Sequence, residues 1–167
     1  MKLIFPLRQH IGVPSEPVVS TGTHVKRDQL IAKKPDASLG ANIFSSVDGT
    51  VYSVNEAEIV INEENTDFSK YEKLSETTPL KLIEESGLVG LGGAGFPTYV
   101  KLGKKFESGG VIAVNAAECE PILSHNIDRI EKEPEQLIEG LKIVMGVVNA
   151  QRGIICLKHI HTEAIEI

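Results

Sequence analysis

The sequence has few cysteines, no long apolar run and no excess of positive charge, and each absence excludes a class of protein. Only two of its 167 residues are cysteine, Cys119 and Cys156, and they form no C-x-x-C motif. Iron–sulfur clusters and tetrahedral zinc ions are held by sets of closely spaced ligands, whereas these two cysteines are 37 positions apart, so we expect the chain alone to hold neither. We also expect no disulfide, because thiols stay reduced in the cytoplasm.

No apolar run approaches the roughly 20 residues that a membrane-spanning helix requires. The opening segment, Met1–Phe5, is too short for a signal peptide and is followed by Pro6 and Arg8. We therefore expect a cytoplasmic protein without a transmembrane segment.

The net charge of −6 is unevenly distributed along the chain. Residues 1–62 hold six of the 17 Lys and Arg and six of the 23 Asp and Glu, so the acidic excess lies in residues 63–167. Proteins that bind nucleic acid carry the opposite charge, so we expect no nucleic-acid partner. A phosphate bound by this chain would have to be held by main-chain dipoles and a lysine.

Residues 1–62 are rich in Val, Ile, Ser and Thr and contain frequent Gly and Pro, which predicts a small domain of short strands. Asp48-Gly49 predicts a tight turn. A domain of this size with few core residues is expected to be a compact barrel or sandwich. The expected strands are Pro17–Val19, His24–Val25, Gln29–Ala32, Ala41–Phe44, Thr50–Val54 and Glu58–Ile61.

Two sequence segments in this domain, Gly22–Ala32 and Ser45–Val51, resemble the two halves of a biotinyl/lipoyl-type barrel-sandwich hybrid. In that family a lysine on the exposed hairpin between the halves carries the cofactor. The corresponding hairpin here, Pro35–Gly40, has no lysine, so we interpret the domain as a docking or stabilising module. Lys33 and Lys34 beside the hairpin are expected to be solvated.

Residues 63–78 are polar and aperiodic and are interpreted as a linker, and residues 79–167 have an α/β pattern. Strand, helix and strand in this order predict a parallel crossover, with both strands buried on both faces. Because two parallel strands leave apolar edges exposed, either another chain supplies further strands or the chain is part of a longer protein, and we favour the second interpretation. The expected elements are a helix over 80–86 ended by Gly87, a short helix over 97–106, a strand over 111–114, a helix from Pro134 and a strand over 153–157.

The segment Gly87–Pro97 holds five of the 15 glycines within nine residues. Glycine lets the backbone adopt positive φ and lets amide N–H groups converge on an anion, so the segment is typical of a phosphate-binding loop. Gly90, Gly92 and Gly95 satisfy G-x-G-x-x-G, but the preceding segment is predicted to be a helix where the dinucleotide motif needs a strand. A tight helix-to-helix connection without a ligand is the alternative.

A short segment with three polar side chains, Asn115–Pro121, follows the first predicted strand of the α/β part. Ligands of open α/β sheets bind at the carboxyl ends of the strands, so Asn115, Glu118 and Glu120 are candidates for ligand contact. A solvated loop is the alternative.

Together, Gly90–Thr98, Lys101 and Asn115–Pro121 closely resemble the flavin/NADH-binding region of the RnfC family. That family includes the NADH-oxidising subunit of the Rnf complex, the cobalamin reductase of propanediol microcompartments and the electron-transfer protein associated with proline reductase. It is related to the flavin-bearing NADH subunit of respiratory complex I. The resemblance implies an α+β chain: an all-β barrel-sandwich hybrid over 1–62, a linker over 63–78 and a partial α/β FMN/NADH-binding domain over 79–167.

The resemblance also implies roles for individual residues. Gly90, Gly92, Gly93 and Gly95 would line the FMN and NADH phosphates, and Lys101 would pair with the flavin phosphate. Phe96 would stack near the nucleotide, Asn115 would hydrogen-bond the isoalloxazine or ribityl group, and Glu118 and Glu120 complete the set, Glu120 on the NADH side. The chain departs from its complex I relatives at Ala117, where they carry an acid, and at Lys104, where they carry an aromatic residue.

The function implied by the resemblance is electron transfer from NADH through FMN towards [4Fe-4S] clusters. The cluster-binding cysteine motifs of the family are absent from this chain, so we expect the chain alone to be inactive and the clusters to lie in the remaining part of the full protein. The expected partners are NADH and other subunits of an electron-transfer complex, with peripheral association at a membrane. The rival hypothesis is a binding or assembly module without a cofactor.

Three further residues are weaker candidates. Cys119 could be a redox thiol, but its two flanking glutamates disfavour the thiolate. His159 and His161 could bind a metal, although a solvated strand end explains them without a third ligand. Cys156 is expected in the core.

Overall fold

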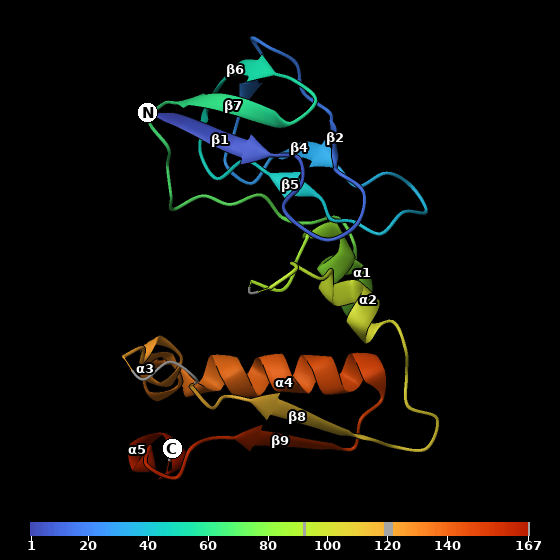
Figure 1. Ribbon diagram of the computed structural model, residues 1–167, viewed down its shortest axis with the longest axis vertical. Coiled ribbons are helices and arrows are strands. Elements are labelled where there is room, and N and C mark those ends of the chain that lie inside the picture. The colour runs from blue at the N-terminus through green and yellow to red at the C-terminus, as the bar shows by residue number, and fades with distance from the viewer. Residues whose placement is uncertain (92, 119–121, 167) are drawn as a thin grey trace. The chain divides into compact units, whose positions relative to one another are not determined.

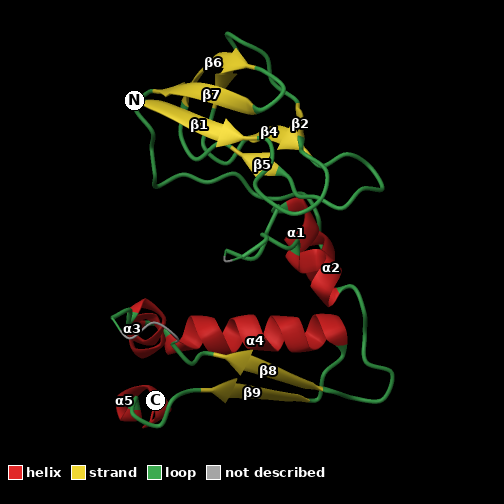
Figure 2. Cartoon of the chain, in the orientation of Figure 1, coloured by secondary structure: helices red, strands yellow, loops and turns green. Residues whose placement is uncertain are grey.

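The computed structural model describes residues 1–91, 93–118 and 122–166, and the structural statements below concern these residues. The chain divides into two compact units, Met1–Lys101 and Leu102–Ile167, and each is described by itself. The first unit contains the β structure and two short helices, and the second contains a two-stranded parallel sheet with three helices (Figures 1 and 2).

The β domain of the first unit is built from two antiparallel sheets. One sheet has the strand order β1-β7-β6-β3 and the other has the order β2-β4-β5. The strands are β1 (Lys2–Pro6), β2 (Glu16–Pro17), β3 (His24–Val25), β4 (Leu30–Lys33), β5 (Ile43–Phe44), β6 (Gly49–Val54) and β7 (Glu58–Glu63).

The core of this domain comes from alternate residues of the strands, because successive side chains of a strand point to opposite faces. Ile59 and Ile61 on β7 are completely buried, as are Val25 and Ile31 on β3 and β4. Each buried aliphatic side chain stabilises the fold by about 1.5–3 kcal/mol relative to an exposed one. The remaining buried members of the cluster are Phe5, Leu7, Ala32, Ile43, Val47 and Val51.

Two features of the β domain differ from the sequence prediction. The opening segment, for which no strand was predicted, forms β1 and pairs along its whole length with β7. The tight turn predicted at Asp48-Gly49 is wrong, because Gly49 is the first residue of β6 and pairs with both Val25 and Glu63. A Cβ at Gly49 would lie 2.2 Å from the carbonyl oxygen of Asn62, so glycine is needed here for close strand approach.

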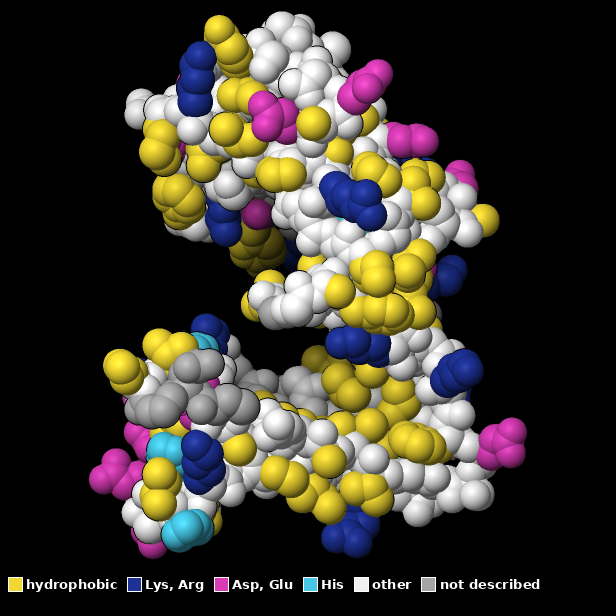
Figure 3. All heavy atoms as spheres, viewed as in Figure 1, with side chains coloured by type: hydrophobic (Ala, Val, Ile, Leu, Met, Phe, Trp, Pro, Cys, Tyr) yellow, Lys and Arg dark blue, Asp and Glu magenta, His cyan; other side chains and the backbone are white. Residues whose placement is uncertain are grey.

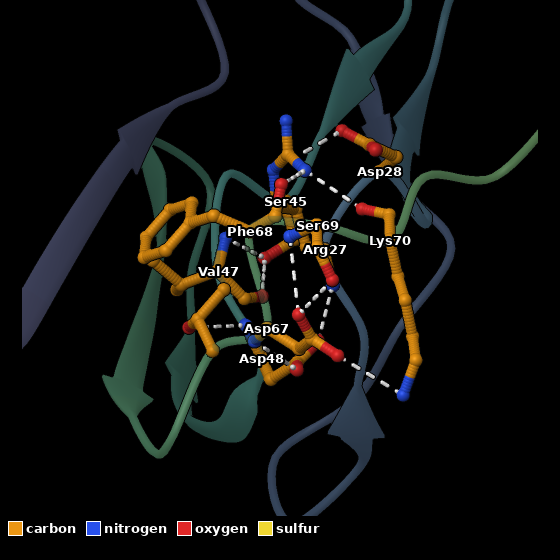
Figure 4. A network of polar contacts seen from close by, with 10 residues as sticks. Arg27, Asp28, Ser45, Val47, Asp48, Asp67, Phe68, Ser69 and Lys70 are labelled. Atoms are coloured by element: carbon orange, nitrogen blue, oxygen red, sulfur yellow. Dashed lines mark hydrogen bonds and ion pairs between the residues drawn. The ribbon is translucent and has the colours of Figure 1, made fainter.

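The segment that follows β7 runs along the β domain, and a polar network fastens it there (Figure 4). Asp48 accepts the Arg27 main-chain N–H through Oδ1 at 2.7 Å, and its Oδ2 lies 3.4 Å from the amide nitrogen of Asp67. The Arg27 guanidinium donates to the carbonyl oxygens of Phe68 and Lys70. The first part of the predicted linker is therefore attached to the β domain through Arg27 and Asp48.

Two helices complete the first unit: α1 (Pro79–Glu85) and α2 (Thr98–Leu102), whose last residue lies in the second unit. The predicted end of the first helix is confirmed, since Gly87 has φ +68° and its N–H donates to Glu84. The second helix is shorter than the predicted segment 97–106. Tyr99 and Lys101 of this helix lie in the first unit, as does the glycine-rich loop, Gly87–Pro97.

The second unit contains β8 (Val111–Asn115), α3 (His125–Lys132), α4 (Pro134–Val148), β9 (Arg152–Cys156) and α5 (Thr162–Glu166). The predicted parallel pairing is confirmed, with Val111 opposite Arg152 and Asn115 opposite Cys156. The α4 helix packs against both strands. A Cβ at Gly153 would lie 2.7 Å from a methyl carbon of Leu141, so glycine lets the helix approach β9 closely.

Both strands were predicted to be buried on both faces, and this is wrong. One face is turned towards α4, whereas residues of the other face, such as Val111, Ile154 and Cys156, are exposed. Figure 3 shows hydrophobic side chains on the visible face of this unit. Cys156, predicted to be core, is exposed because it lies on the face opposite α4.

The α3 helix was not predicted, because it carries only two buried apolar residues, Ile127 and Ile130. These pack with Ala164 of α5. Across the described ranges, no helix is long and apolar enough to cross a membrane.

Candidate functional site

The glycine-rich loop is a closed structure within the first unit. Val89 and Pro97 form an antiparallel bridge at its base. Two hydrogen bonds flank that bridge, from Gly90 N–H to Phe96 C=O at 3.0 Å and from Thr98 N–H to Leu88 C=O at 2.9 Å. The base of the loop is therefore fixed, and one of its predicted ligand-binding amides, that of Gly90, is already bonded.

Further along the loop the main chain keeps free donors. The N–H groups of Gly93, Ala94 and Gly95 donate to no other described residue. Gly93 is exposed with φ +66°, and a Cβ there would meet no atom within 4 Å. Ala94 is exposed as well, whereas Gly95 is buried, so two successive donors, the amides of Gly93 and Ala94, lie at the surface. Successive main-chain donors at a surface are an arrangement that can bind an anion.

Phe96 and Lys101, both predicted at the site, lie near each other. The Lys101 ammonium is 5.8 Å from the centroid of the Phe96 ring, a cation–π distance. Lys101 is exposed and forms no ion pair with a carboxylate among the described residues. Its charge is therefore available to a phosphate near the loop.

Asn115 and Glu118 belong to the second unit. Asn115 ends β8, and its Oδ1 accepts the N–H of Ala117 at 3.2 Å, which leaves the side-chain NH₂ as a donor. A cavity of about 380 Å³ at this end of the strand is lined by Asn115 together with residues of α3 and α4, among them Asn126 and Arg129. Its volume is in the range of small-ligand pockets.

The Glu118 carboxylate is mostly buried and is held by α3. Its Oε2 accepts the Asn126 side-chain N–H at 2.8 Å and lies 3.9 Å from the His125 ring nitrogen Nδ1. This oxygen therefore has a structural partner, and the loop that carries it is attached to the start of α3.

The nine predicted site residues fall into three groups. Five of them lie in the first unit, where the structure brings Gly90, Phe96 and Lys101 together at the base of the loop. Asn115 and Glu118 lie in the second unit. Gly92 and Glu120 lie outside the described residues, as does Cys119.

No sequence pattern assigned a role to Ala94, although its amide is one of the free donors and its carbonyl accepts a hydrogen bond from Ile11. In the described part of the chain, no cluster of His, Cys, Asp or Glu could hold a metal ion. His159 and His161 therefore have no third ligand there.

Comparison with known families identifies both parts of the chain. Residues 1–69 match the RnfC barrel-sandwich hybrid domain, and residues 83–167 match the Nuo51 FMN-binding domain. The order of the two matches agrees with the two-sheet β structure followed by helices and a parallel strand pair. The chain belongs to the RnfC family.

Similar proteins of known name support this membership. The chain is 34% identical to a subunit of the proton-translocating ferredoxin:NAD(+) oxidoreductase complex of Clostridium ljungdahlii, with 99% of this chain and 40% of the relative covered. It is 31% identical to a subunit of the Na(+)-translocating ferredoxin:NAD(+) oxidoreductase complex of Acetobacterium woodii, covering 98% and 41%. For a subunit of the ion-translocating oxidoreductase complex of Salmonella arizonae the identity is 29%, covering 98% and 27%. The chain thus spans less than half the length of these relatives.

Proposed function

We propose that this chain is the flavin-binding part of an electron-transfer protein that passes electrons from NADH through FMN towards iron–sulfur clusters. The family match to an FMN-binding domain supports the cofactor. The names of the relatives, which are ferredoxin:NAD(+) oxidoreductase subunits, support NAD(H) and an iron–sulfur partner. The clusters would be held by parts of the full protein beyond this chain or by its partner subunits.

The observation that carries the proposal is the glycine-rich loop with its unbonded donors. The exposed amides of Gly93 and Ala94, which have no acceptor among the described residues, would donate to the flavin phosphate, and Lys101 would offset its charge. Because the loop is closed at its base, these donors are held in place before the ligand arrives, which lowers the ordering cost of binding. The residues present therefore fit a phosphate group.

Bound FMN would supply the redox chemistry itself, taking a hydride from NADH and releasing the electrons singly. The chain's own residues need only bind and orient. Phe96 offers an aromatic face beside the Lys101 ammonium, and the Asn115 side-chain NH₂ is a donor for a flavin oxygen. That Asn115, Glu118 and Glu120 contact the same nucleotide stays a prediction.

Titration of the chain with FMN, followed by quenching of flavin fluorescence, tests this function. Micromolar binding is expected, with a loss of at least tenfold in affinity for Lys101→Glu, since a charged hydrogen bond contributes about 1.5–3 kcal/mol. Lys73→Glu is the matched control, because Lys73 is exposed and lies in the segment between β7 and α1. Equal losses for the two variants would contradict a specific role of Lys101.

A second candidate function follows from other contacts of the same loop. Gly87 and Gly95 lie against the β domain, so part of the glycine content serves docking and not ligand access. A chain that retains these contacts but binds no FMN would be a binding or assembly module, the alternative to the flavoprotein. The FMN titration separates the two.

A further inference from the structure

The glycine-rich loop rests directly on the backbone of the β domain. A Cβ at Gly87 would lie 2.2 Å from the carbonyl oxygen of Asn42, and a Cβ at Gly95 would lie 2.9 Å from that of Gln9. The Ile11 N–H donates to the Ala94 carbonyl oxygen at 2.8 Å. Both glycines have positive φ, so two separate points of the loop need glycine in order to touch the domain.

The segment that receives the loop is itself held by a buried histidine. His10 is only 6% exposed, and its Nε2 accepts the Ala41 main-chain N–H at 3.2 Å. Nε2 therefore carries no hydrogen, and the proton of the neutral ring lies on Nδ1, 3.1 Å from the carbonyl oxygen of Ile11. Ser15 completes the cluster, since its hydroxyl donates to the Ala41 carbonyl oxygen at 2.7 Å.

His10 contacts the loop with its main chain and the hairpin with its ring. A Cβ at Gly95 would be 3.1 Å from the Cα of His10, and a Cβ at Gly40 would be 3.3 Å from the ring carbon Cε1. His10 thus lies between the hairpin that follows β4 and the glycine-rich loop. The hairpin also contacts the helix that precedes that loop, since Lys34 pairs with Glu84 of α1 at 3.2 Å.

We propose that His10 is a positioning residue for the glycine-rich loop, and that the hairpin 34–42 with segment 9–11 is the surface on which the loop is held. In the carrier domains that this domain resembles, the hairpin presents the modified lysine, whereas here it supports a loop that is distant in the sequence, residues 87–97. The inference deepens the proposed function, because the supported loop is the one assigned to the flavin phosphate.

Hydrogen exchange in the absence of flavin tests the positioning role. The Ile11 amide reports the contact with Ala94, and the Gly90 and Thr98 amides report closure of the loop. In His10→Leu, which loses the hydrogen bonds of the ring, these three amides should exchange at least tenfold faster, while those of β6 and β7 keep their rates. His24→Leu is the control, because the His24 side chain is 60% exposed on β3.

Two further variants keep the test decisive if His10→Leu unfolds. His10→Gln retains an acceptor for the Ala41 N–H and should restore most of the protection of the Ile11 amide. Gly95→Ala leaves the core of the β domain unchanged and should free the loop by steric conflict with Gln9. Equal acceleration of loop and strand amides, or unchanged loop amides in all three variants, would overturn the proposal.

The FMN titration separates this inference from the proposed function. We expect His10→Leu to weaken FMN binding about tenfold while His24→Leu binds normally. If the unchanged chain binds no FMN but His10→Leu still releases the loop, the positioning role stands and the flavin function fails. If FMN binds through Lys101 but the His10 variants bind equally well, the positioning role fails and the flavin function stands.

Discussion

The Asn42 side chain joins the β domain to the end of α1. Its Nδ2 donates to the main-chain carbonyl oxygen of Glu85 at 2.9 Å, while its Oδ1 accepts the main-chain N–H of Lys34 at 3.0 Å. The carbonyls of the last helical turn have no partner within the helix, so Asn42 satisfies one of them from another element. This single amide therefore links the hairpin of the β domain to the helix that precedes the glycine-rich loop.

Replacing Asn42 by alanine should destabilise the first unit. Two main-chain groups lose their partner, and a partly buried unsatisfied group costs about 1–3 kcal/mol. Urea unfolding measures the loss. Gln9→Ala is the comparison, because within the described ranges the exposed Gln9 side-chain amide makes a single local hydrogen bond, to Pro6. Its removal should change the free energy of unfolding by less than about 0.5 kcal/mol. Similar values for the two variants would contradict the linking role.

Gly87→Ala and Gly22→Ala form a matched pair. Both glycines have positive φ, which costs an alanine roughly 1–2 kcal/mol. Only at Gly87 would the new methyl group also collide with the Asn42 carbonyl oxygen, because nothing lies within 4 Å at Gly22. We expect Gly87→Ala to be the more destabilising by at least about 1 kcal/mol in urea unfolding. Equal losses would show that the loop does not touch the β domain at this point.

Alanine substitutions in the second unit should lower the stability at the packed Gly153 of β9 but raise it at Gly140 and Gly146 of α4. Gly153→Ala would place a methyl group 2.7 Å from a methyl carbon of Leu141 and 2.9 Å from the sulfur of Met145, and should cost about 1–3 kcal/mol. Gly140 and Gly146 lie within α4 with no atom near their Cβ positions. Alanine at either should stabilise the helix by about 0.5–1 kcal/mol, which thermal unfolding can measure. A loss at Gly140 would contradict this account.

Acid should loosen the segment that runs along the β domain. The hydrogen bonds from Ser69 and Lys70 lower the pKa of Asp67 from its usual 3.8 to about 2. Since the pKa is lower in the folded chain, the carboxylate stabilises the fold fully above pH 3.8, and this contribution is lost as the pH falls towards 2. Hydrogen exchange of residues 64–70 between about pH 5 and about pH 2 checks the effect. Asp67→Asn should remove this part of the pH dependence; an unchanged profile would contradict the assignment.

Local patterns in the sequence predicted the features that depend on neighbouring residues. Gly87 ends α1 as expected, and the apolar runs of β8 and β9 pair in parallel. The β domain with its two sheets also agrees with the prediction from short strands. In each case a few consecutive residues determine the feature, through a helix-ending glycine or through the periodicity of apolar side chains.

The failures involve partners that are distant in the sequence. Lys34 was expected to be solvated, but its side chain is only 16% exposed because it pairs with Glu84. Gly95 was interpreted only as a ligand contact, yet it lies against Gln9 and His10. The α3 helix was missed because only two of its residues are buried. A local pattern cannot show which distant segment will cover a residue.

The central claim is that the glycine-rich loop and Lys101 bind the phosphate of FMN. Riboflavin has the same ring system without the phosphate, so comparing the affinities of the two ligands by calorimetry isolates that group. The account predicts that the chain binds FMN at least tenfold more tightly than riboflavin and that Lys101→Glu abolishes most of the difference. Equal affinities for the two ligands, or a difference that Lys101→Glu leaves intact, would contradict it.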